Sequence, residues 1–138
     1  QFFTGKLSDH IGRQKPIVWG MWICGAGVAL MLLGEGVAWW SLSAAVTGFG
    51  MALLYPNLSA AVSDIAHPNW RGSAIGIYRF WRDLGYGIGA LALGIVASLS
   101  GAIEEAFWFV AISMLLSGLV VQIWGEETHP RLNPASAP

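Results

Sequence analysis

The sequence predicts an all-α integral membrane protein with four transmembrane helices. Of its 138 residues, 55% are hydrophobic and only 11% are charged, and the mean hydropathy is +0.58. A soluble domain usually carries about a quarter charged residues. The composition therefore argues against a soluble globular domain, and also against disorder, which needs low hydrophobicity and high net charge.

Four apolar stretches reach the length of about 20 residues that a helix needs to cross the hydrocarbon core. They follow one another at residues 16–34, 39–63, 71–100 and 105–124. The connections, 35–38, 64–70 and 101–104, are short, so consecutive spans must be antiparallel neighbours. We divide the chain into the end of a preceding helix with a loop (1–15), the four-helix membrane part (16–125) and a polar tail (126–138).

The Lys and Arg residues outside the spans lie on one side of the predicted membrane. One side holds Lys6, Arg13, Lys15, Arg71 and Arg131, and the other holds Glu35, Glu104 and Glu105 without any Lys or Arg. Because basic loops stay inside, we expect the loop 1–15 and the tail to be cytoplasmic and the protein to cross the cell (inner) membrane several times. Tryptophans near the span ends fit the membrane interface: Trp39, Trp40, Trp70, Trp108 and Trp124.

Catalytic and metal-binding patterns are poorly represented. The single Cys24 excludes an intramolecular disulfide framework, and the net charge of −1 gives no reason to expect nucleic-acid binding. The three histidines, His10, His67 and His129, lie outside the spans. The spacing of Glu126 and His129 matches half of a di-iron site, but such sites need two of these motifs inside a bundle. We expect no enzyme activity, no metal and no cofactor.

The segment before the first span, residues 5–15, reads as a tight turn between two helices. Gly5 and Gly12 permit close approach or positive φ. Asp9 and Arg13 are four residues apart, so a helical turn would pair them. An alternative is a basic loop that only fixes the topology.

The residues Gly5-x-x-x-Asp9-x-x-Gly12-Arg13 resemble the signature of major facilitator superfamily transporters, with Gln14 in place of a basic residue. In that family the signature joins the second and third helices and again the eighth and ninth. The resemblance covers the whole chain. It implies that Asp9 and Arg13 belong to a cytoplasmic gating motif, a charge network that locks one half of the transporter against the other.

The resemblance also indicates which half this is. Residues 43–50 lack the Arg that the fourth helix of the family usually carries, and the chain stops in a Pro-rich tail at 128–138. The opening of the third span, residues 71–83, looks like the eleventh helix of a prokaryotic subgroup. We therefore identify the spans as helices 9–12 of a twelve-helix fold. Because the first residue is Gln1, we expect the chain to begin inside a longer protein.

The third span contains an intramembrane charge cluster, Arg79, Arg82 and Asp83. Their spacing puts them on one helix face, and Tyr86 continues it. Charges inside a bilayer usually face a partner or a wet cavity and mark functional sites. The competing interpretation is that Arg79 snorkels to the interface while Arg82 and Asp83 pair structurally.

In the second span, small and polar residues form a stripe opposite the apolar Leu42, Val46, Phe49 and Leu53, which we expect to face lipid. The stripe consists of Ser43, Thr47, Gly50, Leu54, Asn57, Ala61 and Asp64. With Pro56 allowing a kink, Thr47 and Asn57 are candidates for cavity lining, as is Tyr86. The alternative is packing of small residues between helices, which is favoured for Ser43 and Gly50.

Glycines in the third span form two GxxxG pairs, Gly72/Gly76 and Gly85/Gly89, which predict close helix packing. The run 85–89 superficially matches a dinucleotide loop, but it lies inside a span rather than after a strand, so cofactor binding is rejected.

The resemblance to the major facilitator superfamily, together with these features, implies secondary active transport of a small solute by alternating access. The alternative is a transporter-like membrane sensor or assembly partner that moves nothing. The expected partners are the lipid bilayer, the missing N-terminal half of the same protein, and a small-molecule substrate. The substrate moves down its own gradient or is coupled to a proton or another ion, and Asp83 is the candidate proton site.

Overall fold

The computed structural model describes residues 11–129, and within them the chain forms long helices. The helices are α2 (Gln14–Leu32), α3 (Val37–Ile65), α4 (Arg71–Ser100) and α5 (Ile103–Trp124). Each is long and apolar enough to cross a membrane. This confirms the all-α membrane fold class and the four predicted spans, whose ends shift by no more than two residues.

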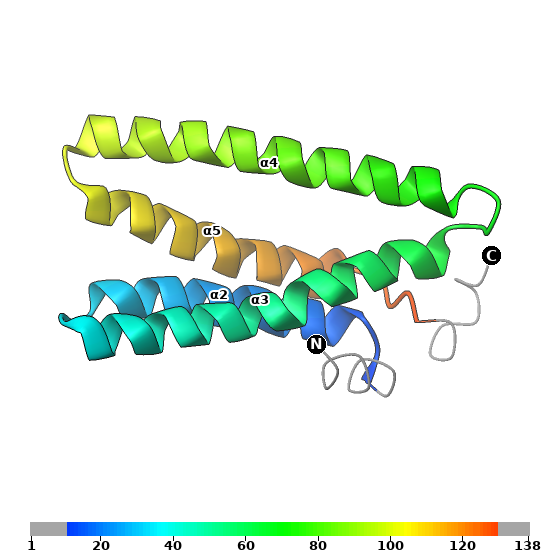
Figure 1. Cartoon of the computed structure of the whole chain (residues 1–138), viewed down its shortest axis with the longest axis horizontal. Helices are drawn as coiled ribbons and strands as arrows, with labels where there is room; N and C mark the ends of the chain where they lie inside the picture. The colour runs from blue at the N-terminus through cyan, green and yellow to red at the C-terminus, as the bar shows by residue number, and fades with distance from the viewer. Residues whose placement is uncertain (1–10, 130–138) are drawn as a thin grey trace.

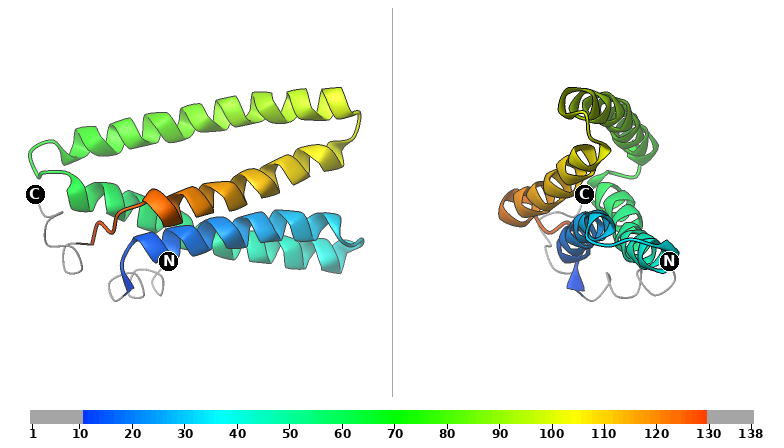
Figure 2. Two further views of the ribbon diagram at one scale, coloured as in Figure 1. Left: turned by 180° about the vertical axis from the view of Figure 1, so that it is seen from behind. Right: turned by 90° about the vertical axis from the view of Figure 1, so that its left-hand side faces the viewer.

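Consecutive helices run antiparallel, and α2 packs against both α3 and α5 (Figures 1 and 2). The buried residues of α2 include Gly20, Cys24 and Gly27, where the absence of large side chains lets the neighbouring backbones come close. The core of the described bundle is therefore the layer on both sides of α2.

Helix α4 lies at the edge of the bundle, and none of its residues is buried. It meets α5 at a turn of residues 101–102 and diverges from it toward the other end of the bundle (Figure 1). Gly101 makes this short turn possible, because its φ of +71° lies in the left-handed region that side chains disfavour. Its N–H donates to the carbonyl of Ala97 at 3.0 Å and closes the end of α4.

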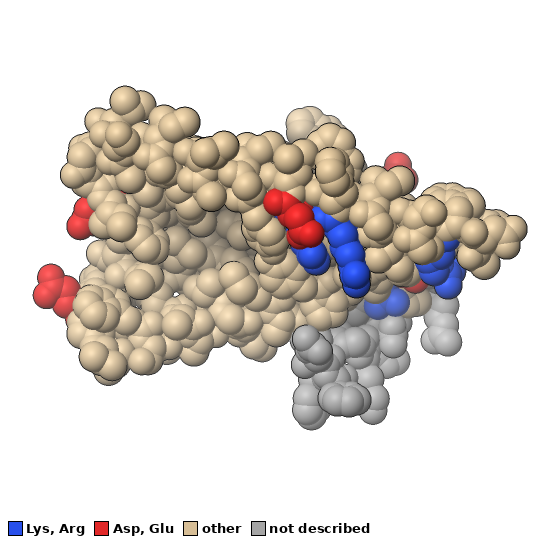
Figure 3. Space-filling view, turned by 45° about the horizontal axis from the view of Figure 1, so that its top comes forward, with Lys and Arg blue, Asp and Glu red and all other residues tan. Residues whose placement is uncertain are grey.

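In Figure 3 the left-hand end of the bundle shows acidic but no basic side chains, and the basic side chains lie from the middle toward the right, together with further acidic ones. The connection between α2 and α3 and the start of α5 carry Glu35, Glu104 and Glu105; we call this the acidic end. Arg13, Lys15 and Arg71 lie where α2 and α4 begin, and we call this the basic end.

One expectation for α3 was wrong. Leu42 and Phe49 are exposed, as a lipid-facing side requires, but Leu53 is only 4% exposed. Because α3 contacts α4 as well as α2, more of its circumference is covered than the single polar stripe indicated.

Candidate functional site

Arg13, at the start of α2, forms an ion pair with Asp64, at the end of α3. Its Nε lies 2.9 Å from Oδ2 of Asp64, and the two side chains are only 14% and 19% exposed. The pair joins residues that are 51 positions apart in the sequence. Two members of the predicted gating motif, Gly5 and Asp9, lie outside the described residues, as does His10.

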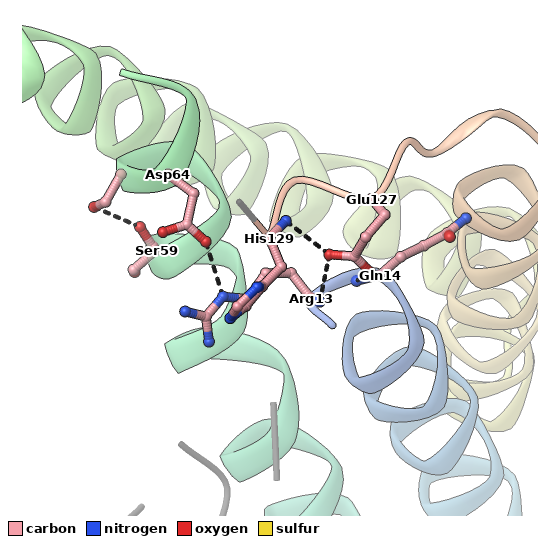
Figure 4. A network of polar contacts seen from close by, with 7 residues as sticks. Arg13, Gln14, Ser59, Asp64, Glu127 and His129 are labelled. Atoms are coloured by element: carbon pink, nitrogen blue, oxygen red, sulfur yellow. Dashed lines mark hydrogen bonds and ion pairs between the residues drawn. The ribbon is translucent and has the colours of Figure 1, made fainter. Parts of the chain in front are cut away.

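Glu127, in the segment after α5, caps the N-terminus of α2 (Figure 4). Its carboxylate accepts hydrogen bonds from the backbone N–H of Arg13 at 2.8 Å, of Gln14 at 3.3 Å and of His129 at 2.9 Å. The first N–H groups of a helix have no partner inside it and carry partial positive charge, so an anion there is stabilised.

The same contact explains Gly12, another residue of the predicted motif. Its φ is +91°, and a Cβ there would overlap the Glu127 carboxyl group. Partial burial raises the pKa of Glu127, but the backbone N–H groups of Arg13, His129 and Gln14 lower it more, so the pKa falls below its ordinary value. Glu127 is therefore held as a carboxylate against the start of α2.

Gln14 connects the start of α2 to the end of α5. Its side-chain Nε2 donates to the carbonyls of Val121 at 3.1 Å, Gln122 at 3.3 Å and Gly125 at 2.8 Å. These carbonyls belong to the last turn and the end of α5, and that of Val121 also accepts from the backbone N–H of Gly125 at 2.8 Å. The residue that departs from the family signature thus ties the start of α2 to the end of α5.

Together these contacts form what we call the basic-end network: Arg13, Gln14, Asp64, Glu127 and His129 (Figure 4). It connects α2, α3 and the chain after α5 through polar groups at one end of the bundle. From the sequence, Arg13 was predicted to belong to the gating motif and Asp64 to the polar stripe of α3. Gln14 and Glu127 were not recognised as residues that join the start of α2 to the end of α5. The available signal for Glu127 was its position just after the last predicted span, at the end of the bundle where the first span begins.

The intramembrane cluster lies on the exposed side of α4, where basic and acidic side chains adjoin in Figure 3. Arg82 donates to Oδ1 of Asp83 from Nε at 3.0 Å and from Nη2 at 2.9 Å. Its guanidinium also lies 5.9 Å from the ring centre of Tyr78. Within residues 11–129, Arg79 has no ion-pair partner.

Tyr86, the fourth residue predicted on this face, connects α4 to α3. Its hydroxyl is hydrogen-bonded to the hydroxyl of Tyr55. Tyr86 is otherwise exposed, so it lies at the border between the packed and the uncovered sides of α4.

The polar stripe of α3 faces α2. Ser43 donates to the carbonyl of Gly27 at 2.5 Å, and a Cβ on Gly27 would overlap Thr47. Asn57 is 2% exposed, and its side chain donates to the carbonyl of Leu53 at 2.6 Å. In the described part of the chain, Thr47 and Asn57 therefore lie toward the contact between helices.

The predicted GxxxG pairs of α4 meet no neighbour. Apart from the neighbouring backbone of α4 itself, a Cβ at Gly72, Gly76, Gly85 or Gly89 would have no atom within 4 Å among the described residues. Gly85 and Gly89 instead line a cleft of about 290 Å³ between α4 and α5. Within residues 11–129, no three His, Cys, Asp or Glu side chains gather where they could hold a metal ion.

Comparison with known proteins adds a family. The sequence model of the Major Facilitator Superfamily matches residues 1–137. An uncharacterized MFS-type transporter of Salmonella typhimurium is 28% identical over 123 residues, which are 89% of this chain and 31% of that protein. The MFS-type transporter criB of Aspergillus cristatus is 33% identical over 62% of this chain and 18% of its own length.

A further relative is an uncharacterized MFS-type transporter of Burkholderia mallei, 32% identical over 78% of this chain and 24% of its own length. The chain thus spans less than a third of the length of these curated relatives. No solved structure gives a significant match.

Proposed function

Because this chain belongs to the Major Facilitator Superfamily, we propose that it forms helices 9–12 of a secondary transporter that moves a small solute by alternating access. The family consists of membrane transport proteins, and the relatives above are named as transporters. Such proteins have two halves that rock against each other around a central site. A segment of less than a third of the length fits within one half.

We place the basic end in the cytoplasm. Arg13, Lys15 and Arg71 lie at this end, and Glu35, Glu104 and Glu105 lie at the other. This asymmetry supports the orientation because Lys and Arg are retained on the cytoplasmic side. The membrane would then be the cell (inner) membrane.

The observation that carries the mechanism is the ion pair between Arg13 and Asp64 within the basic-end network. Rocking of one half as a rigid body requires that its helices move together at the end that opens. The network supplies this connection, because it ties α2 to α3 through Asp64 and to α5 through Gln14 and Glu127. It also fixes Arg13, the residue that follows Gly12.

A double-mutant cycle on uptake tests this role. In the full-length protein reconstituted into vesicles, Arg13→Gln and Asp64→Asn should each slow solute uptake by roughly tenfold, equivalent to about 1.4 kcal/mol. The double variant should be no slower than either single one, because both remove the same interaction. Glu35→Gln at the acidic end is the matched control and should leave the rate unchanged.

Two outcomes contradict different parts of the proposal. Additive losses, or no loss in either single variant, would show that the ion pair does not serve the transport cycle. A full-length protein that moves no solute from a broad panel of organic acids, amines and sugars would contradict transport itself and favour the sensor or assembly role.

A further inference from the structure

A groove on the α2–α5 pair opens at the basic end. It has a volume of about 210 Å³ and is lined by Gln14, Lys15, Val18, Trp19, Trp22 and Gln122. Lys15 and Gln14 stand in the first turn of α2, and Gln122 stands in the last turn of α5. The groove therefore lies at the level where a spanning helix leaves the hydrocarbon core.

Two donors in this groove are unused by the described part of the chain. Lys15 is exposed, and neither its ammonium nor the indole N–H of Trp19 has a partner within residues 11–129. The indole of Trp22, by contrast, donates to the carbonyl of Leu115 at 3.3 Å, which fixes this ring against α5. The carboxylate of Glu127 at the same end already accepts from three backbone N–H groups.

The surrounding helices favour lipid over protein as the neighbour of this groove. Between Pro16 and Leu32, and between Ala106 and Trp124, neither helix carries a charged side chain. The charged residues within a span, which need a protein partner or water, lie on α4: Arg79, Arg82 and Asp83. A cation and indole rings at a span end are the chemistry that meets phospholipid head groups.

We propose that this groove binds the head group of an anionic phospholipid. Lys15 and the Trp19 indole N–H contact its phosphate, while the ring of Trp22 contacts the first carbons of the acyl chains. The site is independent of the transported solute, and rests only on α2 and α5 spanning the membrane.

Native mass spectrometry of the detergent-solubilised full-length protein, titrated with phosphatidylglycerol, tests the proposal. Wild type should retain one phosphatidylglycerol in preference to phosphatidylcholine. Lys15→Gln should weaken that binding about fivefold, which corresponds to about 1 kcal/mol for one Lys at an anionic surface, and Lys15→Arg should restore it. Trp19→Leu should weaken it as well.

The basic end offers matched controls outside the groove. Arg71 is an exposed basic residue, and Trp70 is 53% exposed against 47% for Trp19. Arg71→Gln and Trp70→Leu should leave phosphatidylglycerol binding unchanged. Equal losses in the Lys15 and Arg71 variants, unchanged binding in Lys15→Gln, or full displacement of the lipid by excess inorganic phosphate would each overturn the site.

Discussion

At the scale of single residues, Glu127 has the most consequential position. It lies beyond the last helix, yet its carboxylate caps a helix that begins 113 residues earlier. The first N–H groups of a helix have no acceptor within the helix, and a carboxylate at the N-terminus accepts their hydrogen bonds in place of water. The segment after α5 is thereby tied to the start of α2 through a charged group.

The lowered pKa of Glu127 predicts how its contribution to stability depends on pH. The unfolded chain takes up the proton near the ordinary pKa of about 4.3, above the pH at which the folded state does. The stabilisation is therefore complete above that value and is lost as the pH falls through the lowered folded pKa. Glu127→Gln should cost about 1 kcal/mol at pH 7, as the loss of a helix cap does.

Thermal unfolding of the detergent-solubilised full-length protein at pH 7 and at about pH 3 measures this difference. The melting temperatures of wild type and Glu127→Gln should converge at the lower pH. Glu126→Gln, in the adjacent exposed position, should behave like wild type at both. A gap of the same size at both pH values would contradict the cap.

At the scale of helices, the sequence predicts the spans well and their packing less well. Helix length follows from apolar composition alone, which is why the ends of α2 to α5 differ from expectation by at most two residues. The stripe of small residues on α3 was visible, but its partner stripe on α2, Gly20, Cys24 and Gly27, was not recognised. These three follow the same spacing as Ser43, Thr47 and Gly50. A comparison of the two sequences could therefore have indicated that these faces of α2 and α3 pack together.

The basic-end network could not be predicted in the same way. Its members come from residues 13–14, 64 and 127–129, and nothing local connects these segments. From the sequence, Arg13 was assigned to the gating motif with Asp9, Asp64 was placed on the polar stripe, and the loop charges were interpreted as signals of orientation. Their mutual contacts depend on how α2 packs between α3 and α5, which is a property of the tertiary fold.

The contact between α2 and α3 predicts a sharp difference between two neighbouring glycines of α3. A Cβ at Gly50 would lie 2.7 Å from the backbone N and Sγ of Cys24 and 2.9 Å from the carbonyl of Gly20, whereas a Cβ at Gly48 would meet nothing within 4 Å. Gly50→Ala should therefore force the helices apart and cost about 1–3 kcal/mol. Gly48→Ala should be neutral or slightly stabilising, because alanine is the better helix former.

Thermal unfolding of the two full-length variants, solubilised in the same detergent, measures this difference. A melting temperature for Gly50→Ala equal to that for Gly48→Ala would show that α2 and α3 do not approach so closely.

At the scale of the whole molecule, the outer side of α4 is not covered by any other described helix. Helix α4 buries none of its residues, and it carries Arg79, Arg82 and Asp83 inside a span. Charges in a membrane require protein partners or water. Since the chain covers less than a third of its relatives, the uncovered side of α4 is where we expect the rest of the transporter to pack.

Replacing Asp83 best distinguishes a role in proton coupling from a structural role in the ion pair with Arg82. Asp83 is the acidic side chain that lies deep within a span among the described residues, since Asp64, Glu104 and Glu105 lie in end turns of their helices. If Asp83 carries the coupled proton, Asp83→Asn should abolish the pH dependence of uptake while exchange of solute across the membrane continues. Glu104→Gln, at the acidic end, should keep the wild-type pH profile. An unchanged profile in Asp83→Asn would contradict this role and leave the aspartate with the ion pair to Arg82.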